Sequence, residues 1–342
     1  MNPVWRAVRI ACWVATIPFC LRLIACGGGS QTTSSLPGAH GSCNFQAGGN
    51  CALIVNGVSR TYFLHLPRNF QPNASGLVIA FHGARGTGRE FEVSTGLSQK
   101  ADQVGFAVVY PDGLPNPSGA TSWNGYFNPT FGPNPPDDSG FTRQLILTLE
   151  ANLHPNPKKI YVTGLSAGGY MAHRAAIDHS DLVAAAGVVE GSLSVQTAGG
   201  SQKPPAAKSP AAVLILHGDA DGVIPYCGVT NSNVTVASQD QTFNYWVQTP
   251  ANACSTLNTT ASLCTGFGGS PTNVTLKNAI GCNGSAEVRL YRLMGATHTW
   301  YRTTMDVPPG TATQPYNPNF NSATGIVTND ILWNFFASYA KP

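Results

Sequence analysis

Short continuous apolar runs constrain the fold of this 342-residue chain more than any other feature. The runs Leu77–Phe81 and Phe106–Tyr110 are typical of strands that are buried on both faces of a parallel sheet. A segment with helical spacing, residues 97–104, lies between them, and the alternation continues further along the chain. Strands that alternate with helices predict an α/β fold, with a mainly parallel central sheet and helices on both faces.

The other elements follow the same alternation. A long loop rich in Pro, Asn and Gly spans residues 114–136, and either Asp137 or Asp138 could cap the helix after it. No linker divides the chain after residue 43, so residues 43–342 are expected to form a single domain. We expect further strands at 58–66, 159–163, 182–189, 213–216 and 288–294, and further helices up to about 151 and at 167–179, 239–247 and 326–340.

The N-terminus has the layout of a signal peptide. Arg6 and Arg9 precede an apolar run, residues 10–21, that is too short to span a bilayer comfortably. The run leads into Leu-Ile-Ala-Cys at Cys26, which resembles the lipobox of bacterial lipoproteins, although Arg22 is an unusual neighbour for a cleavage site. An ordinary secretory signal and an uncleaved anchor are the alternatives.

On the lipoprotein interpretation, residues 1–25 are the signal peptide and residues 26–42 are a flexible tether lipidated at Cys26. The protein would then be extracellular or periplasmic and would touch a membrane only through its N-terminal lipid. We expect it to be a monomer.

Cysteine usage agrees with export. Two of the nine cysteines belong to the predicted leader and Cys26 would carry the lipid, which leaves an even set suited to three disulfides. Cys43 and Cys51 are close in sequence and are expected to pair, whereas the other four allow three pairings. No spacing suggests a metal site, and no cofactor is expected. The six cysteines are Cys43, Cys51, Cys227, Cys254, Cys264 and Cys282.

The charge balance excludes one class of partner. The chain has 19 basic and 16 acidic residues, and the three arginines of the leader reduce the basic count to 16. A mature chain near neutrality gives no indication of binding nucleic acid or another polyanion.

Ser166 is the candidate nucleophile. It is the serine of a G-x-S-x-G pattern in the segment Ile160–Ala176, between an expected strand and an expected helix. This is the context of the nucleophile turn in α/β-hydrolases, where Gly164 and Gly168 avoid collisions with neighbouring backbone. The helix N-terminus would favour the negative charge that develops there.

A serine needs a base, and the base needs an acid that orients it. In α/β-hydrolases the acid and then the histidine follow the serine in the chain. His298 lies in a loop after the last expected strand, which is the position of the base. Asp219 and Asp221 follow the strand at 213–216, and the order of the chain leaves both as candidate acids.

The backbone N–H groups of Ala84 and Ala167 are the expected oxyanion hole. Ala167 follows the nucleophile, and Ala84 lies in the turn directly after the strand Leu77–Phe81. His82 precedes this turn and is expected to shape it rather than to act as a base.

A more specific likeness is carried by five segments in order: LVIAFHGARGTG, GFAVVYPDG, YVTGLSAGGYMA, LILHGDADGVIPY and GATHTWY. From about Arg60 to Trp300 the chain resembles the esterase family that includes polyhydroxybutyrate depolymerases, feruloyl esterases and acetylxylan esterases. The resemblance implies one α/β-hydrolase catalytic domain, with Asp221 as the acid and His298 as the base. Thr297 and Tyr301 depart from the Gly and Pro that are frequent in the family.

The resemblance also implies the disulfide pairs Cys254–Cys282 and Cys227–Cys264. It implies a secreted serine carboxylesterase that forms an acyl-enzyme on feruloyl or acetyl esters of plant polysaccharide. Ester bonds in polyhydroxybutyrate oligomers are the rival substrate, and a non-catalytic surface lipoprotein is the rival class. Trp123, Tyr126 and Trp300 could line an acyl site, with ordinary packing as the alternative.

Overall fold

The computed structural model describes residues 41–126, 131, 134–197, 204–230, 234–258, 274–302 and 327–342. The predicted signal peptide, Cys26 and Cys264 lie outside these residues, as does almost all of the predicted tether. No helix in the described ranges is both long and apolar enough to cross a membrane.

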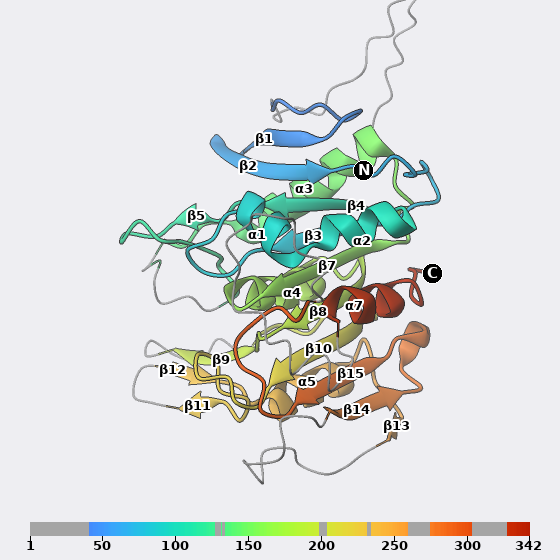
Figure 1. The fold of residues 1–342 in the computed structure, drawn as a ribbon. Helices are drawn as coiled ribbons and strands as arrows, with labels where there is room; N and C mark the ends of the chain where they lie inside the picture. Colours follow the sequence, from blue (N-terminus) through green and yellow to red (C-terminus); the bar gives the residue numbers. More distant parts are fainter. Residues whose placement is uncertain are drawn as a thin grey trace, which may run out of the picture. The chain divides into compact units, whose positions relative to one another are not determined.

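The described part of the chain is built on a ten-stranded sheet with the order β1-β2-β4-β3-β7-β8-β10-β15-β14-β13 (Figure 1). The six central strands, from β4 to β15, run parallel, and antiparallel strands flank them at both edges. The ten strands are β1 (Gly49–Val55), β2 (Val58–His65), β3 (Leu77–Phe81), β4 (Ala107–Pro111), β7 (Ile160–Leu165), β8 (Val183–Val189), β10 (Ala212–Gly218), β13 (Thr256–Leu257), β14 (Val274–Ile280) and β15 (Val288–Leu293).

Helices cover both faces of this sheet, as the alternation predicts. One core cluster packs the sheet against α3, α4 and α5, and the other packs it against α1, α2 and α7. Both faces of the central strands are therefore buried, which explains why their sequences read as continuous apolar runs. The helices are α1 (Gly88–Thr95), α2 (Leu97–Val104), α3 (Asp138–Leu153), α4 (Ala167–Asp178), α5 (Gln239–Gln248) and α7 (Thr328–Phe336).

The start of α3 resolves the choice between two neighbouring aspartates. Asp137 is the N-cap, and its side chain accepts a hydrogen bond from the Gly140 N–H at 2.8 Å. Asp138 is instead fully buried and pairs with Arg60 at 2.7 Å, and its second oxygen accepts the Asn124 N–H. Through these two contacts, Asp138 connects β2 and Asn124 of the long loop to α3.

The elements that the sequence did not predict lie mostly at the edges. They are β1, α1, β13, β14 and two small sheets. One small sheet pairs β5 (Leu114–Pro115) with β6 (Thr121–Ser122). The other consists of β9 (Ser194–Thr197), β11 (Val229–Thr230) and β12 (Val234–Val236). Edge strands lack the continuous apolar run of a strand buried on both faces.

Two of the three predicted disulfides are present. Cys43 pairs with Cys51, and Cys254 pairs with Cys282. The first joins β1 to the segment before it, and the second joins the segment after α5 to the segment after β14. The predicted pair Cys227–Cys264 includes a residue outside the described ranges.

Candidate active site

Ser166 lies in the turn between β7 and α4, at the carboxyl edge of the parallel strands. Its φ of 58° and ψ of −121° are unusual for a residue with a side chain and are found at strained turns in functional sites. Its N–H donates to the Val189 carbonyl at 3.0 Å, and its carbonyl accepts the Gly169 N–H at 2.8 Å. The turn is therefore held against the end of β8 and the first turn of α4.

The glycines on either side of Ser166 have no space for a side chain. A Cβ at Gly164 would lie 2.3 Å from the Gly168 carbonyl oxygen, and a Cβ at Gly168 would lie 2.0 Å from the Phe81 carbonyl oxygen. Both distances are far below van der Waals contact, so the close packing of β3, β7 and α4 requires glycine at both positions.

Asp221 and His298 meet although 77 positions separate them. The strands β10 and β15 are parallel neighbours, so the loops after them start at the same edge of the sheet. His298 Nδ1 lies 2.7 Å from Asp221 Oδ2, and Asp221 Oδ1 accepts the N–H groups of Val223 and Ile224 at 2.7 and 2.9 Å. Because Nδ1 is occupied, Nε2 is the nitrogen of His298 that can take a proton.

The surroundings of Asp221 keep it ionised. Burial by itself would raise the pKa of this carboxyl group, but hydrogen bonds from His217, His298 and the Ile224 N–H outweigh burial. Together they hold the pKa of Asp221 well below its usual range. A charged carboxylate next to the imidazole can orient the ring and stabilise its protonated form.

Asp219, the other candidate acid, has different partners. Its Oδ2 accepts from Arg292 Nε at 2.9 Å, and its Oδ1 accepts the Gly295 N–H at 2.6 Å. Asp219 therefore connects the end of β10 to the end of β15, and of the two aspartates Asp221 is the one that contacts His298.

Ser166 and His298 share one edge of the sheet without a hydrogen bond between them. Among the hydrogen bonds of the described residues, none joins the serine hydroxyl to the imidazole. Contacts between a nucleophile and its base often shorten only once substrate binds. The catalytic roles of Ser166, Asp221 and His298 remain predictions.

The two predicted oxyanion donors lie in suitable turns. Neither the Ala84 nor the Ala167 N–H has an acceptor within the described ranges. The turn that holds Ala84 approaches the nucleophile, because a Cβ on Gly83 would lie 3.6 Å from Ser166 Cβ. A substrate oxygen between the two turns could accept both N–H groups.

His82 fixes the first of these turns. Its Nε2 accepts the Gly113 N–H at 2.9 Å, so the hydrogen of a neutral ring lies on Nδ1, which is 2.7 Å from the Gly83 carbonyl oxygen. Burial lowers the pKa of His82. A neutral histidine with both nitrogens occupied fits a structural role.

Two predicted substrate contacts, Trp123 and Trp300, are buried. Trp123 is 1% exposed and its indole N–H donates to the His82 carbonyl at 2.9 Å. Trp300 is 7% exposed and donates to Asn329 Oδ1 at 2.9 Å. These buried positions favour the packing alternative, in which Trp123 supports the turn that holds Ala84 through its hydrogen bond to the His82 carbonyl.

A buried polar cluster next to Asp221 was missed from the sequence. Glu190 follows the end of β8 and His217 lies near the end of β10, and each is fully buried. Within the described ranges, one group of side chains has the spacing of a possible metal site, with its potential ligand atoms all within 4.8 Å of one another: Glu190, His217 and Asp221. His217 Nε2 is already 2.8 Å from the Ile224 carbonyl and Asp221 holds His298, so hydrogen bonding accounts for this arrangement.

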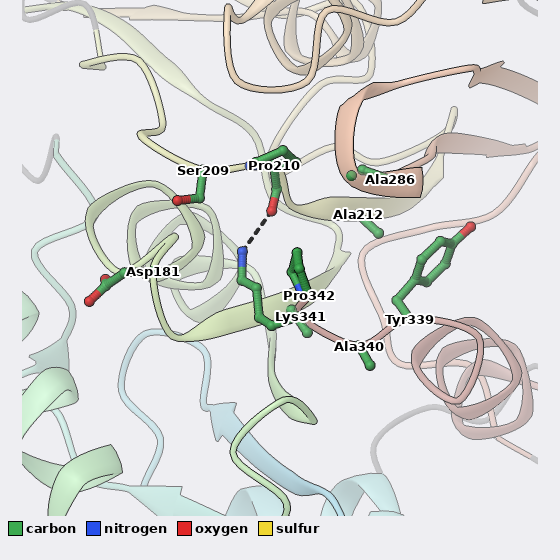
Figure 2. A pocket seen from close by; sticks show the side chains of 11 residues that line it. Asp181, Ser209, Pro210, Ala212, Ala286, Tyr339, Ala340, Lys341 and Pro342 are labelled. Atoms are coloured by element: carbon green, nitrogen blue, oxygen red, sulfur yellow. Dashed lines mark hydrogen bonds between the residues drawn. The ribbon is translucent and has the colours of Figure 1, made fainter.

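A cavity of about 320 Å³ lies at the opposite edge of the sheet (Figure 2). Ala184 and Ala212, near the starts of β8 and β10, line it together with residues 339–342. Lys341 crosses it to donate to the Pro210 carbonyl at 2.7 Å, and burial lowers the pKa of this lysine to about 8. The cavity is separate from the edge that carries Ser166.

A parallel sheet with helices on both faces, and a strained serine at its carboxyl edge beside a hydrogen-bonded Asp–His pair, define a protein of the α/β-hydrolase fold. The Esterase family model matches residues 56–264, which is more than half of the chain. The chain therefore belongs to the Esterase family.

Curated relatives carry esterase or depolymerase names. Feruloyl esterase B of Piromyces equi is 28% identical over 214 residues, covering 57% of this chain and 38% of that protein. Acetylxylan esterase A of Talaromyces purpureogenus is 30% identical over 129 residues, covering 38% of this chain and 33% of that protein. Poly(3-hydroxyalkanoate) depolymerase C of Paucimonas lemoignei is 28% identical over 249 residues, covering 69% of this chain and 57% of that protein. The chain thus matches between about a third and somewhat over half of the length of these relatives.

Among solved structures, the S-formylglutathione hydrolase of Agrobacterium tumefaciens aligns with a TM-score of 0.50 at 11% identity. The alignment covers 87% of this chain and 98% of that one. Identity this low supports the shared fold alone.

Proposed function

We propose that this protein is an exported serine carboxylesterase that works through an acyl-enzyme. The observation that carries the proposal is the 2.7 Å contact between His298 Nδ1 and Asp221, at the same sheet edge as the strained Ser166 turn. A carboxylate, an imidazole and a serine in this chain order are the components of a hydrolytic triad. Two disulfides suit an oxidising compartment, and Cys26 is the proposed lipid anchor.

Each residue has a defined part in the proposed reaction. His298 Nε2 takes the hydroxyl proton of Ser166 as its oxygen attacks the ester carbonyl, and Asp221 stabilises the resulting imidazolium. The N–H groups of Ala84 and Ala167 bind the oxyanion. The tetrahedral intermediate collapses, and the alcohol leaves with the proton from His298. Water, activated by the same histidine, then releases the acid and frees Ser166.

We propose feruloyl or acetyl esters of plant polysaccharide as the substrates, because relatives named feruloyl esterase and acetylxylan esterase support this class. Esters of hydroxybutyrate oligomers are the second candidate, because the named depolymerase aligns over the largest share of this chain among the relatives above. A substrate panel of methyl ferulate, acetylated xylan and hydroxybutyrate oligomers separates the two by their kcat/KM values.

Replacement of the nucleophile tests the proposal directly. Ser166→Ala should lower kcat on p-nitrophenyl acetate by at least about 10³-fold with the fold intact, because no other group can form the acyl-enzyme. Ser338→Ala, at an exposed serine after α7, is the matched control. The wild-type protein should also be labelled at Ser166 by a fluorophosphonate. Full activity of Ser166→Ala would disprove the nucleophile, and a wild-type protein that is neither active nor labelled would favour the non-catalytic lipoprotein.

A further inference from the structure

Glu190 is a buried acidic residue next to Asp221 that the proposed mechanism does not use. It directly follows β8, is fully buried and has a φ of 47°, which is uncommon for a residue other than glycine. Its side chain accepts the Gly218 N–H, at 2.9 Å from Oε1 and 3.1 Å from Oε2. Its Oε1 also lies 2.7 Å from the Tyr301 hydroxyl. Glu190 is therefore in contact with two other chain segments.

These two segments carry the proposed acid and base. Gly218 ends β10 and begins the loop that holds Asp221. Tyr301 lies three residues after His298, and its hydroxyl is also 2.7 Å from the carbonyl oxygen of Thr297, the residue before His298. Glu190 thus connects the acid loop to the base loop from the end of a third strand.

The protons in this chain of contacts can be counted. The Thr297 carbonyl can only accept, and the Tyr301 hydroxyl has one hydrogen to donate. If that hydrogen goes to Thr297, the contact between Tyr301 and Glu190 needs a hydrogen from Glu190. Two contacts of 2.7 Å around one hydroxyl therefore fit a protonated Glu190.

The charges around Glu190 point the same way. Burial raises the pKa of Glu190 well above its usual range, and the negative charge of Asp221 and a side-chain hydrogen bond with Asp221 raise it further, with the contacts to Tyr301 and the Gly218 N–H as a partial offset. His217 also faces the group, with Nε2 at 3.3 Å from Glu190 Oε2. This Nε2 lies 2.8 Å from the Ile224 carbonyl, which can only accept, so it already carries a hydrogen and cannot take one from Glu190.

We propose that Glu190 is a positioning residue that acts as a neutral carboxylic acid: it donates to Tyr301, Tyr301 donates to the Thr297 carbonyl, and the base loop is thereby fixed against the acid loop. The proposal rests on the proposed esterase function. A neutral Glu190 leaves Asp221 as the carboxylate that supplies the negative charge beside His298. Tyr301, where the family frequently has Pro, thus has a specific role in this chain.

Three variants test the positioning role by kinetics. The amide of Glu190→Gln can donate to Tyr301 and accept from Gly218 as the protonated acid does, so we expect kcat within about threefold of wild type. Glu190→Ala removes both contacts and should lower kcat by about 10- to 100-fold with little change in KM, as for other groups that orient a catalytic residue. Tyr301→Phe should lower kcat by about 10-fold, and adding Glu190→Ala to it should cost less than in the wild type. If Glu190→Gln is as impaired as Glu190→Ala, or Glu190→Ala keeps wild-type kcat, the proposal is wrong.

The protonation of Glu190 can be measured without any activity. The infrared difference spectrum between wild type and Glu190→Gln at neutral pH should contain the carbonyl stretch of a protonated carboxylic acid. A carboxylate band in its place would overturn the proposal even if Glu190→Ala fails to fold. Failure of the esterase function would be seen separately, as a wild-type protein that neither hydrolyses esters nor reacts with a fluorophosphonate.

Discussion

The nucleophile turn and the acid–base loops lie at the same sheet edge but are built in opposite ways. The turn is continuous in sequence, and backbone packing fixes it, because Gly164 and Gly168 leave no volume between β3, β7 and α4. The acid–base side joins Asp221 to His298 across 77 positions. Side-chain hydrogen bonds among buried polar groups fix that side.

This difference predicts which substitutions each region tolerates. A turn fixed by excluded volume should be sensitive to any added atom and insensitive to charge. Loops fixed by hydrogen bonds should tolerate small changes in volume and be sensitive to the position of protons and charges. Substitutions matched between the two regions can therefore confirm or contradict the comparison.

The largest effect is expected from charge loss on the acid–base side. Asp221→Asn should lower kcat by about 10³- to 10⁴-fold, because the amide cannot stabilise the imidazolium and favours the wrong tautomer of His298. Asp219→Asn is the matched control two residues away, and since Asp219 contacts Arg292 rather than His298, we expect less than about a 10-fold loss. Steady-state kinetics on p-nitrophenyl acetate measure both. A larger loss for Asp219→Asn would transfer the acid role to that residue.

The next effect is expected from added volume in the turn. Gly168→Ala places a Cβ 2.0 Å from the Phe81 carbonyl oxygen, so it should lower the free energy of unfolding by about 3 kcal/mol or more, or prevent folding.

Gly222→Ala is the control from the acid loop. A Cβ there meets no atom within 4 Å, and we expect a change within about 0.5 kcal/mol. Urea unfolding of both variants decides the point. Equal stabilities would mean that excluded volume does not define the turn.

The same contrast explains what could be predicted from sequence. The nucleophile turn was predictable because the strand, the two glycines and the helix are consecutive, and the clash that requires glycine is local. The chain order alone left Asp219 and Asp221 open, and only the family resemblance favoured Asp221. The structural reason why Asp219 does not contact His298 is distant in sequence, because Asp219 forms an ion pair with Arg292 on β15.

Glu190 and the edge strands could not be predicted for related reasons. An acidic residue at the end of the apolar run 183–189 is a weak signal, since its importance comes from Tyr301 and Gly218, which are distant in sequence. The strands β1 and β14 were missed because pairing with β2 and β15 defines them more than their own apolar content does. Long-range partners, rather than local pattern, determine both cases.

The smallest expected effect is a pH dependence of stability that is specific to the acid–base side. Glu190 has a raised pKa in the folded protein, whereas in the unfolded chain it should ionise near its ordinary value of 4.5. Its contribution to stability is therefore fully present below about pH 4.5 and is lost as the pH rises towards the folded pKa. Glu190→Gln does not titrate, so its stability relative to wild type should increase with pH above that value, by at most about 1.4 kcal/mol per pH unit. Urea unfolding at several values between pH 4 and 7 measures the difference, and Gly222→Ala, which changes no charge, should show none of this slope. A difference in the free energy of unfolding between Glu190→Gln and wild type that stays constant with pH would contradict the proposal. It would mean that Glu190 is ionised in the folded protein and does not connect the two loops by donating a hydrogen bond to Tyr301.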